Sequence, residues 1–313
     1  MLPFHQLLPK QENTEKRLLN RSVTQSALRE EKLLYHYCAL GLVLSGGMAK
    51  GAYQIGFCKA LSENAHFEVK AISAASIGTL NGYAFAAGRS AQAEEIWRSL
   101  DFKGCKKMYD KFLKSGGIMS IAESIHGSSD ELKCFLSTVC WSAGEKKAQY
   151  IRLDKTPPKY RAGFLKASVA VPPIMHSVTV NGKSYYDGAA ADNTPIRPLL
   201  KMRGLDMILA LQFDGYISQK SNDRGVPIMY VNLQEKPIFS DSFDLQRDSV
   251  AKMIEYGYRE GRGILERLEK SENISEEIVR ANAALKENRR TGDHIVRRLN
   301  RLTKIISERE MAE

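Results

Sequence analysis

The sequence contains few cysteines and no long hydrophobic run. Its five cysteines among 313 residues are odd in number and lack the paired short spacings of a zinc site, so neither a disulfide framework nor a structural metal is expected. A reducing, cytoplasmic compartment is the simplest interpretation. The first residues have no apolar core of signal-peptide length, and no later run approaches the length that spans a bilayer. Any association with a membrane is therefore expected to be peripheral.

Acidic residues are fewer than basic ones. The chain has 46 Lys and Arg against 36 Asp and Glu, a formal net charge of +10, which favours a polyanionic partner such as nucleic acid or an anionic lipid surface. Residues 102–118 interleave lysines with aromatic side chains, a pattern that suits the headgroup layer of an anionic membrane but is also typical of a solvated helix face. The basic segment 286–304 has no recognition-helix, zinc or aromatic-stacking module beside it, so nucleic acid is the less expected partner.

The order of apolar segments predicts an α/β fold with helical extensions at both ends. Residues 1–37 are mainly polar with apolar positions at helical spacing, and residues 38–270 form the expected main domain. Two units of strand, tight turn and helix follow one another in it, which implies a mostly parallel sheet with helices on its faces. The expected elements are 40–44, 52–63, 67–73 and 77–87 in these two units, a hairpin at 178–186 around Asn181-Gly182, strands at 207–213 and 228–233, and a helix at 249–270.

Residues 271–313 form the expected basic helical tail. Two apolar sets, Ile274 to Leu285 and Ile295 to Ile306, repeat every three or four residues and are separated by a break around Gly292. This pattern predicts two short amphipathic helices joined by a turn. Their apolar stripes are interpreted either as packing on the chain's own domain or as the seam of a homo-oligomer.

A glycine-rich loop, Ser45-Gly46-Gly47-Met48-Ala49-Lys50-Gly51, directly follows the first expected strand. Such a loop between a strand and a helix usually presents backbone N–H groups to a negative species. A P-loop would need Lys and then Ser or Thr after the last glycine, where this chain has Ala52 and Tyr53. A dinucleotide fingerprint needs glycine at its third position, which is Met48 here. Both nucleotide motifs therefore fail, and no cofactor is predicted.

Ser76 and Asp187 are the candidate reactive side chains. Ser76 lies in Ala74-Ala75-Ser76-Ile77-Gly78, on a sharp turn from strand to helix that exposes a serine hydroxyl above the positive end of the helix. This position suits a nucleophile, and the alternative is an ordinary helix N-cap. Asp187 ends the expected hairpin before small residues that leave its carboxylate accessible, and its alternative is an ordinary turn aspartate. The glycine-rich loop would supply the N–H donors that acyl transfer through a serine needs.

These elements, in this order, resemble the patatin-like phospholipase family. The resemblance covers roughly residues 40–265 and includes the glycine-rich loop, the turn at Ser76, the segment Lys166–Pro172, and Asp187-Gly188-Ala189 followed by Asn193-Thr194-Pro195. It implies a three-layer fold with a mostly parallel central sheet. It also implies a hydrolase that cleaves acyl esters of membrane lipids, of the phospholipase A or lysophospholipase type, through a Ser/Asp dyad.

The resemblance assigns a role to each reactive side chain. Ser76 becomes the nucleophile and Asp187 the general base that takes its proton. An acyl-serine forms, the alcohol leaves, and water activated by Asp187 releases the fatty acid. Histidine has no expected part, because His294 lies in the charged tail outside the resemblance and His176 precedes the aspartate.

The same resemblance makes the glycine-rich loop an oxyanion hole. Backbone N–H groups of Gly46, Gly47 and Met48 would hold the oxyanion. Lys50 and Gly51 would support the loop, and Lys50 either fixes it or contacts an anionic headgroup. None of these residues is expected to bind a metal.

Two residues depart from the family pattern. Ala74 stands where the serine turn usually has glycine, and its methyl group is tolerated if its φ is negative. Met48 replaces the third glycine of the loop, and a positive φ there would cost about 1–3 kcal/mol. Losing one oxyanion donor typically lowers turnover about a hundredfold to a thousandfold. The alternative function is therefore a catalytically silent or activation-dependent module that binds a membrane or a protein partner.

Overall fold

The computed structural model describes residues 37–101, 117–214, 217, 222–233 and 244–288. In this part of the chain, the residues from Ala39 onward belong to one compact unit. The N-terminal extension, the segment 102–116 and the second tail helix lie outside the described residues, so the predictions made for them stay predictions.

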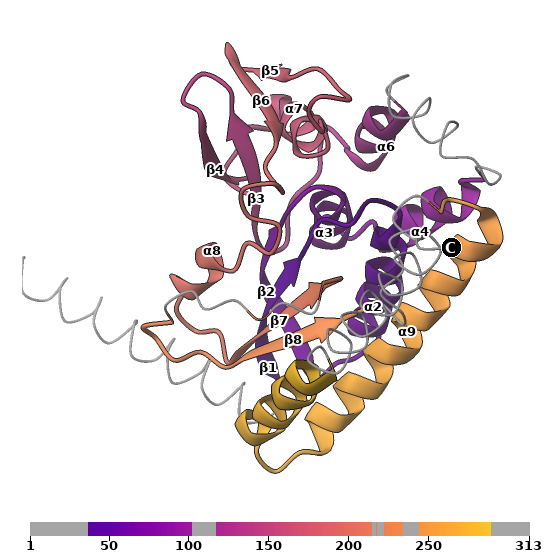
Figure 1. Ribbon diagram of the computed structural model, residues 1–313, viewed down its shortest axis with the longest axis vertical. Coiled ribbons are helices and arrows are strands. Elements are labelled where there is room, and N and C mark those ends of the chain that lie inside the picture. The colour runs from indigo at the N-terminus through magenta and orange to yellow at the C-terminus, as the bar shows by residue number, and fades with distance from the viewer. Residues whose placement is uncertain (1–36, 102–116, 215–216, 218–221, 234–243, 289–313) are drawn as a thin grey trace, which may run out of the picture. The chain divides into compact units, whose positions relative to one another are not determined.

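An eight-stranded, mostly parallel β-sheet forms the centre of this unit (Figure 1). The strands are β1 (Cys38–Leu44), β2 (Phe67–Ala74), β3 (Phe135–Ser142), β4 (Lys147–Arg152), β5 (Val178–Val180), β6 (Lys183–Asp187), β7 (Met207–Gln212) and β8 (Ile228–Asn232). Their order is β5-β6-β3-β2-β1-β7-β8, with β4 paired to β3. The pairs β2/β3, β1/β7 and β7/β8 are parallel, whereas β4 and β6 run antiparallel to β3. The predicted α/β class with a mostly parallel sheet is thus confirmed.

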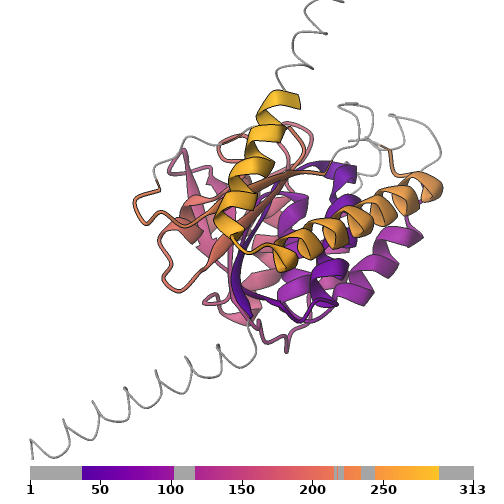
Figure 2. The same ribbon diagram turned by 90° about the horizontal axis from the view of Figure 1, so that it is seen from below.

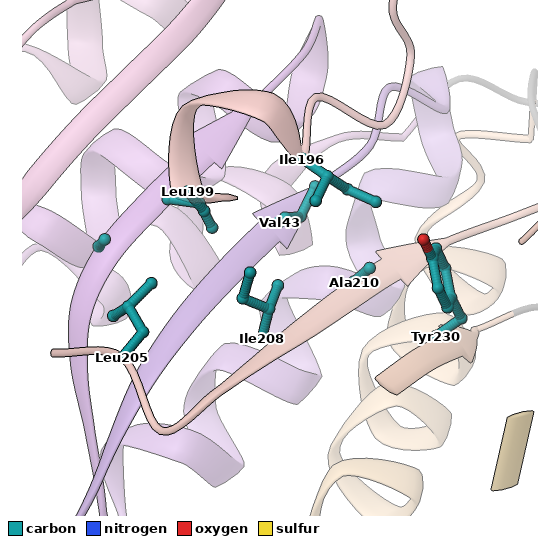
Figure 3. Close-up of a cluster of buried hydrophobic side chains, with 8 residues drawn as sticks. Val43, Ile196, Leu199, Leu205, Ile208, Ala210 and Tyr230 are labelled. Atoms are coloured by element: carbon teal, nitrogen blue, oxygen red, sulfur yellow. The ribbon is translucent and has the colours of Figure 1, made fainter. Parts of the chain in front are cut away.

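Helices pack on both faces of the sheet. They are the 3-10 turn η1 (Met48–Lys50) and the α-helices α2 (Gly51–Ser62), α3 (Ile77–Ala86), α4 (Ser90–Ser99), α6 (Gly117–Ile125), α7 (Pro158–Ser168), α8 (Arg197–Leu200) and α9 (Arg247–Lys270). On one face, Gly82 of α3 lies close to Leu44 and Ile72. On the other face, α8 covers the side chains that alternate with these along the strands. Figure 3 shows this second layer: Val43, Ile196, Leu199, Leu205, Ile208, Ala210 and Tyr230.

Glycines let α9 lie directly against α2, as both views show (Figures 1 and 2). A Cβ atom on Gly56 would collide with the backbone of Ile254, and one on Gly257 would collide with the backbone of Tyr53. The two helices therefore touch backbone to backbone at this crossing. This contact holds α2 in place directly after the glycine-rich loop.

The predicted hairpin is confirmed at β5 and β6. The two central residues of its turn have positive φ, 49° at Asn181 and 75° at Gly182, as a two-residue turn matching the strand twist requires. The hairpin carries Asp187 at its last position, paired with Cys140 of β3. It therefore places Asp187 beside β3, the strand that pairs with β2 on its other side.

The described part of the tail is helical over residues 274–288 and packs on the chain's own unit. Ile278 is buried, and Leu285 packs against the cluster of Figure 3. The Asn282 side chain accepts a hydrogen bond from the Tyr230 N–H (3.0 Å) and donates one to the Ile228 carbonyl (2.7 Å). Its amide thus covers the edge of β8 in place of a further strand. Of the two interpretations of the apolar stripe, these residues show packing on the chain's own domain.

Candidate functional site

Ser76 occupies a strained backbone conformation between β2 and α3. Its φ of 51° and ψ of −133° lie in a region that residues other than glycine rarely adopt. The Ala75 N–H donates to the Leu44 carbonyl (3.0 Å), so the ends of β1 and β2 lie side by side at this point. The Ser76 hydroxyl makes no capping hydrogen bond to α3 in the part of the chain that the structure describes. The side chain is thus held in place by the turn, and capping does not account for it.

Ala74 shows how this turn tolerates a methyl group. Four described residues other than glycine have a positive φ: Met48, Ser76, Lys146 and Asn181. Ala74 is not one of them, so its methyl group introduces no strain of this kind. The glycine that the turn does need is Gly78, because a Cβ there would collide with the Leu44 carbonyl oxygen.

Asp187 lies at the end of β6, where it is buried with 6% of its surface exposed. Its backbone N–H donates to the Ala170 carbonyl (3.0 Å), and its carboxylate accepts a hydrogen bond from the Ala189 N–H (2.8 Å). Burial raises the pKa of this carboxyl from 3.8 to about 6, although hydrogen bonds from the Ser76 hydroxyl and the Ala189 N–H lower it. The fold therefore brings Asp187 to Ser76, and Asp187 is not an ordinary solvated turn residue. His176 is exposed.

The glycine-rich loop is fixed at its first glycine by Asn193. The Gly46 N–H donates to the Asn193 carbonyl (3.3 Å), and the Asn193 side chain donates to the Gly46 carbonyl (3.1 Å). The Gly46 amide, one of three expected oxyanion donors, thus already has a partner. The amides of Gly47 and Met48 donate to no other backbone group among the described residues. These two remain as candidate donors.

The loop needs its glycines because neighbouring groups approach closely. A Cβ on Gly46 would lie 2.8 Å from the Cβ of Ser76, and one on Gly47 would lie 2.5 Å from the Phe213 ring. The φ of Gly47 is −173°, an extended value that any residue adopts. Lys50 lies with its ammonium group 5.5 Å from the centre of the same Phe213 ring, a distance typical of a cation–π contact. Phe213 therefore supports the loop from behind.

An apolar pocket lies beside Ser76. It has about 530 Å³ of empty space, part of it open to solvent, and Ser76 and Met48 contribute to its wall. The other lining side chains come mainly from α3, α4, α6 and the segment after α7, and include Ile77, Ile96, Trp97, Leu100, Ile121 and Val171. Such a lining suits a hydrocarbon chain better than a polar group.

Comparisons with known proteins identify the family of this chain. The patatin-like phospholipase family profile matches residues 42–117 and 100–200, which together span half of the chain. The chain belongs to the patatin-like phospholipase family. The predicted family is thus confirmed, and the matched region contains the glycine-rich loop, Ser76 and Asp187.

Relatives of this patatin-like protein are distant. Lysophospholipase NTE1 of Cryptococcus neoformans is 26% identical over 178 residues, which are 54% of this chain and 11% of that protein. An uncharacterised NTE family protein of Mycobacterium bovis is 25% identical over 183 residues, which are 56% of this chain and 49% of that protein. The matched regions thus span about a tenth and about half of these relatives.

Two solved structures are similar to the patatin-like chain at low sequence identity. VipD from Legionella pneumophila is 15% identical with a TM-score of 0.45, and the match covers 85% of this chain and 77% of that one. A chain of the ExoU–SpcU complex from Pseudomonas aeruginosa is 14% identical with a TM-score of 0.41, covering 84% and 60%.

Within the described ranges, no group of three or more His, Cys, Asp or Glu side chains could hold a metal ion. Among the helices that the structure describes, none is long and apolar enough to cross a bilayer.

Three buried polar residues of this patatin-like site were missed by the sequence reasoning. Gln54 of α2, Asn81 of α3 and Trp97 of α4 are joined by hydrogen bonds under the glycine-rich loop. A signal was available, because Gln54 and Asn81 are amides in helical segments that are otherwise rich in apolar and small residues. Buried amides of this kind require partners, but the sequence does not show which partners they have.

Met48 has the strained backbone conformation that the sequence analysis considered, a positive φ at a residue other than glycine. Its φ is 56°, so the loop has a positive φ at the position where this chain lacks glycine. The free energy of unfolding, measured by urea denaturation, should be about 1 kcal/mol higher for Met48→Gly than for Met48→Ala, because only glycine removes the clash of Cβ with the backbone. The two variants lose the same methionine side chain, so their difference isolates the backbone. Equal stability, or a more stable alanine variant, would contradict strain at this residue.

Proposed function

We propose that this chain is a serine acyl hydrolase that cleaves fatty acyl esters of membrane lipids, with Ser76 as nucleophile and Asp187 as general base. The observation that carries the proposal is the strained Ser76 turn beside a buried carboxyl whose pKa is raised to about 6. A base with a pKa near the working pH accepts a proton more effectively than one with a pKa of 3.8. Membership of the patatin-like phospholipase family supports the reaction class.

The proposed reaction proceeds in two steps. Asp187 takes the proton of the Ser76 hydroxyl while the Ser76 oxygen forms a bond to the acyl carbon of the ester. The ester C–O bond then breaks as Asp187 passes the proton to the departing alcohol. Water attacks the acyl-serine and gives one proton to Asp187, which passes it to the Ser76 oxygen as the bond between that oxygen and the acyl carbon breaks. The fatty acid leaves, and Ser76 and the ionised Asp187 are restored. The N–H groups of Gly47 and Met48 stabilise the oxyanion in both steps.

The apolar pocket beside Ser76 is the proposed site of the acyl chain. Its side chains bury a hydrocarbon chain without unsatisfied polar groups, and Ser76 stands at its wall. The Cryptococcus relative is a lysophospholipase by name, which favours a lysophospholipid among the substrates. We assign the hydrolase to residues 38–270 and keep peripheral binding to an anionic membrane, through the basic aromatic segment 102–118, as part of the proposal.

The proposal predicts an acid limb in the pH profile. Asp187 must be ionised to accept the Ser76 proton, so kcat/KM should fall as the pH drops through about 6. An unperturbed carboxyl would move this limb to about pH 4. The measurement is the initial rate on a neutral ester whose own charge does not change in this range. A limb near pH 4, with the protein still folded, would contradict the buried base.

Fatty acid release from vesicles tests the proposed function. The full chain is incubated with vesicles of phosphatidylcholine, phosphatidylglycerol and their lyso forms, and the products are identified by mass spectrometry. We expect release by the natural sequence, loss in Ser76→Ala, and no loss in Ser62→Ala, which changes an exposed serine at the end of α2. If the protein binds the vesicles but releases nothing, the silent binding module is supported instead.

A further inference from the structure

A chain of buried hydrogen bonds joins the wall of the apolar pocket to the glycine-rich loop. The indole N–H of Trp97 donates to the Asn81 side-chain oxygen (3.0 Å). The Asn81 amide nitrogen donates to the side-chain oxygen of Gln54 (3.0 Å). All three side chains are buried, so each lost hydrogen bond would leave a polar group without water to replace its partner.

These hydrogen-bonded side chains hold the glycine-rich loop at both ends. The Gln54 amide nitrogen donates to the Ser45 carbonyl (2.8 Å), directly before the first glycine. The Asn81 amide nitrogen donates to the Gly51 carbonyl (3.0 Å), directly after the last residue of η1. The two carbonyls flank the amides of Gly47 and Met48. The distance between the two carbonyls is therefore set by side chains from α2 and α3.

Trp97 also contacts the loop and the pocket directly. A Cβ atom on Gly51 would lie 2.8 Å from the Trp97 ring and 2.9 Å from the Ile77 side chain, so the indole packs closely against this glycine. Trp97 also contributes to the wall of the pocket. One side chain thus packs against the loop and lines the space assigned to the acyl chain.

We propose that Gln54, Asn81 and Trp97 are positioning residues that set the geometry of the oxyanion loop and join it to the acyl pocket. The inference rests on the proposed function, because it assigns the loop amides to the oxyanion. None of the three touches the reacting atoms; they act through the Ser45 and Gly51 carbonyls. Since every ester passes through the same oxyanion, disturbing these residues lowers kcat for short and long acyl chains alike.

The test uses two variants that remove hydrogen bonds but retain an apolar side chain at each position. Trp97→Phe removes the indole donor and retains an apolar ring, and Gln54→Met removes both amide hydrogen bonds at similar volume. Rates are measured with para-nitrophenyl butyrate and palmitate, per active site titrated by a fluorophosphonate. We expect kcat to fall about ten- to a hundredfold on both esters with little change in KM. Hydrogen exchange of the peptide 45–51 should become faster in both variants.

Two comparison variants separate positioning from other roles. Ile96→Ala removes part of the pocket wall without removing any of these hydrogen bonds, and should raise KM for palmitate by a larger factor than it lowers kcat on either ester. Ile264→Val removes one buried methyl group from α9 and should lower stability without changing loop exchange. The positioning role would be overturned if Trp97→Phe, like Ile96→Ala, mainly raised KM for palmitate. It would also be overturned if Gln54→Met, like Ile264→Val, lowered stability without changing loop exchange.

Failure of the proposed function has a different signature. If the natural sequence neither cleaves an ester nor reacts with the fluorophosphonate at Ser76, the hydrolase itself is rejected and the positioning role with it. If the natural sequence is active and both variants keep kcat within about twofold, only the positioning role is rejected.

Discussion

Asp187→Asn should lower kcat about a thousandfold to ten-thousandfold and at the same time stabilise the protein. Asparagine has nearly the shape of aspartate and can still accept the Ala189 N–H hydrogen bond, but it cannot take the Ser76 proton. The loss of activity therefore comes from proton transfer alone. The measurement is kcat on a soluble ester, with the amount of folded protein checked by circular dichroism.

The gain in stability follows from the raised pKa of Asp187. Its folded-state pKa of about 6 exceeds the ordinary 3.8, so the folded protein holds the proton more tightly than the unfolded chain. The ionised carboxylate thus destabilises the fold, by an amount that is absent below about pH 4, grows up to about pH 6 and is complete above it. A shift of about two units corresponds to about 3 kcal/mol. Asparagine never ionises and should avoid this loss.

Urea denaturation at two pH values measures this effect. Near pH 8 the Asp187→Asn variant should be more stable than the natural sequence by about 2–3 kcal/mol, and the difference should shrink as the pH falls toward about 4. Asp248→Asn is the control, because Asp248 is an exposed aspartate in the first turn of α9 and should show neither effect. If Asp187→Asn loses activity but is less stable than the natural sequence at pH 8, the buried carboxylate of Asp187 does not destabilise the fold.

Gly47→Ala should lower kcat about a hundredfold to a thousandfold, close to the effect of losing one oxyanion donor. The new methyl group would lie 2.5 Å from the Phe213 ring, so the loop has to move and its amides move with it. Backbone strain is not the reason, because the φ of Gly47 is extended. KM should change less than kcat, since most of the acyl pocket is lined by elements outside the loop.

Two variants check this explanation. Gly144→Ala adds the same methyl group at a turn where nothing lies within 4 Å of it, and should leave kcat unchanged. Gly47→Ala combined with Phe213→Leu makes room for the methyl group and should recover part of the lost rate. If the double variant is no better than Gly47→Ala, the clash with Phe213 is not the cause.

The sequence predicted those elements of the fold that have a strong local signal, whereas β3, β4, α4 and α7 were not predicted. The apolar runs of β1 and β2, the helices after their turns and the Asn181-Gly182 hairpin are all encoded within a few residues. The type of site was also predictable, because glycines after one strand and a serine turn after the next bring donors and a hydroxyl to one edge of a sheet.

The remaining features depend on residues far apart in the chain. Asn193 occupies the Gly46 amide from a distant loop, so the sequence could not show which loop amides remain available. The pKa of Asp187 is set by burial, which follows from packing across several elements. The backbone angle of Met48 could be stated only as a condition. The support from Gln54, Asn81 and Trp97 joins three helices, and the amides within apolar segments indicate that partners exist but not which ones.

Reaction with a fluorophosphonate tests the central claim most directly, because it detects an activated serine without assuming a substrate. We predict one covalent adduct per chain, mapped to Ser76 by peptide mass spectrometry, absent in Ser76→Ala and formed far more slowly in Asp187→Asn. An adduct on another serine, or no adduct on folded protein bound to lipid vesicles, would contradict the assignment of Ser76 as the nucleophile.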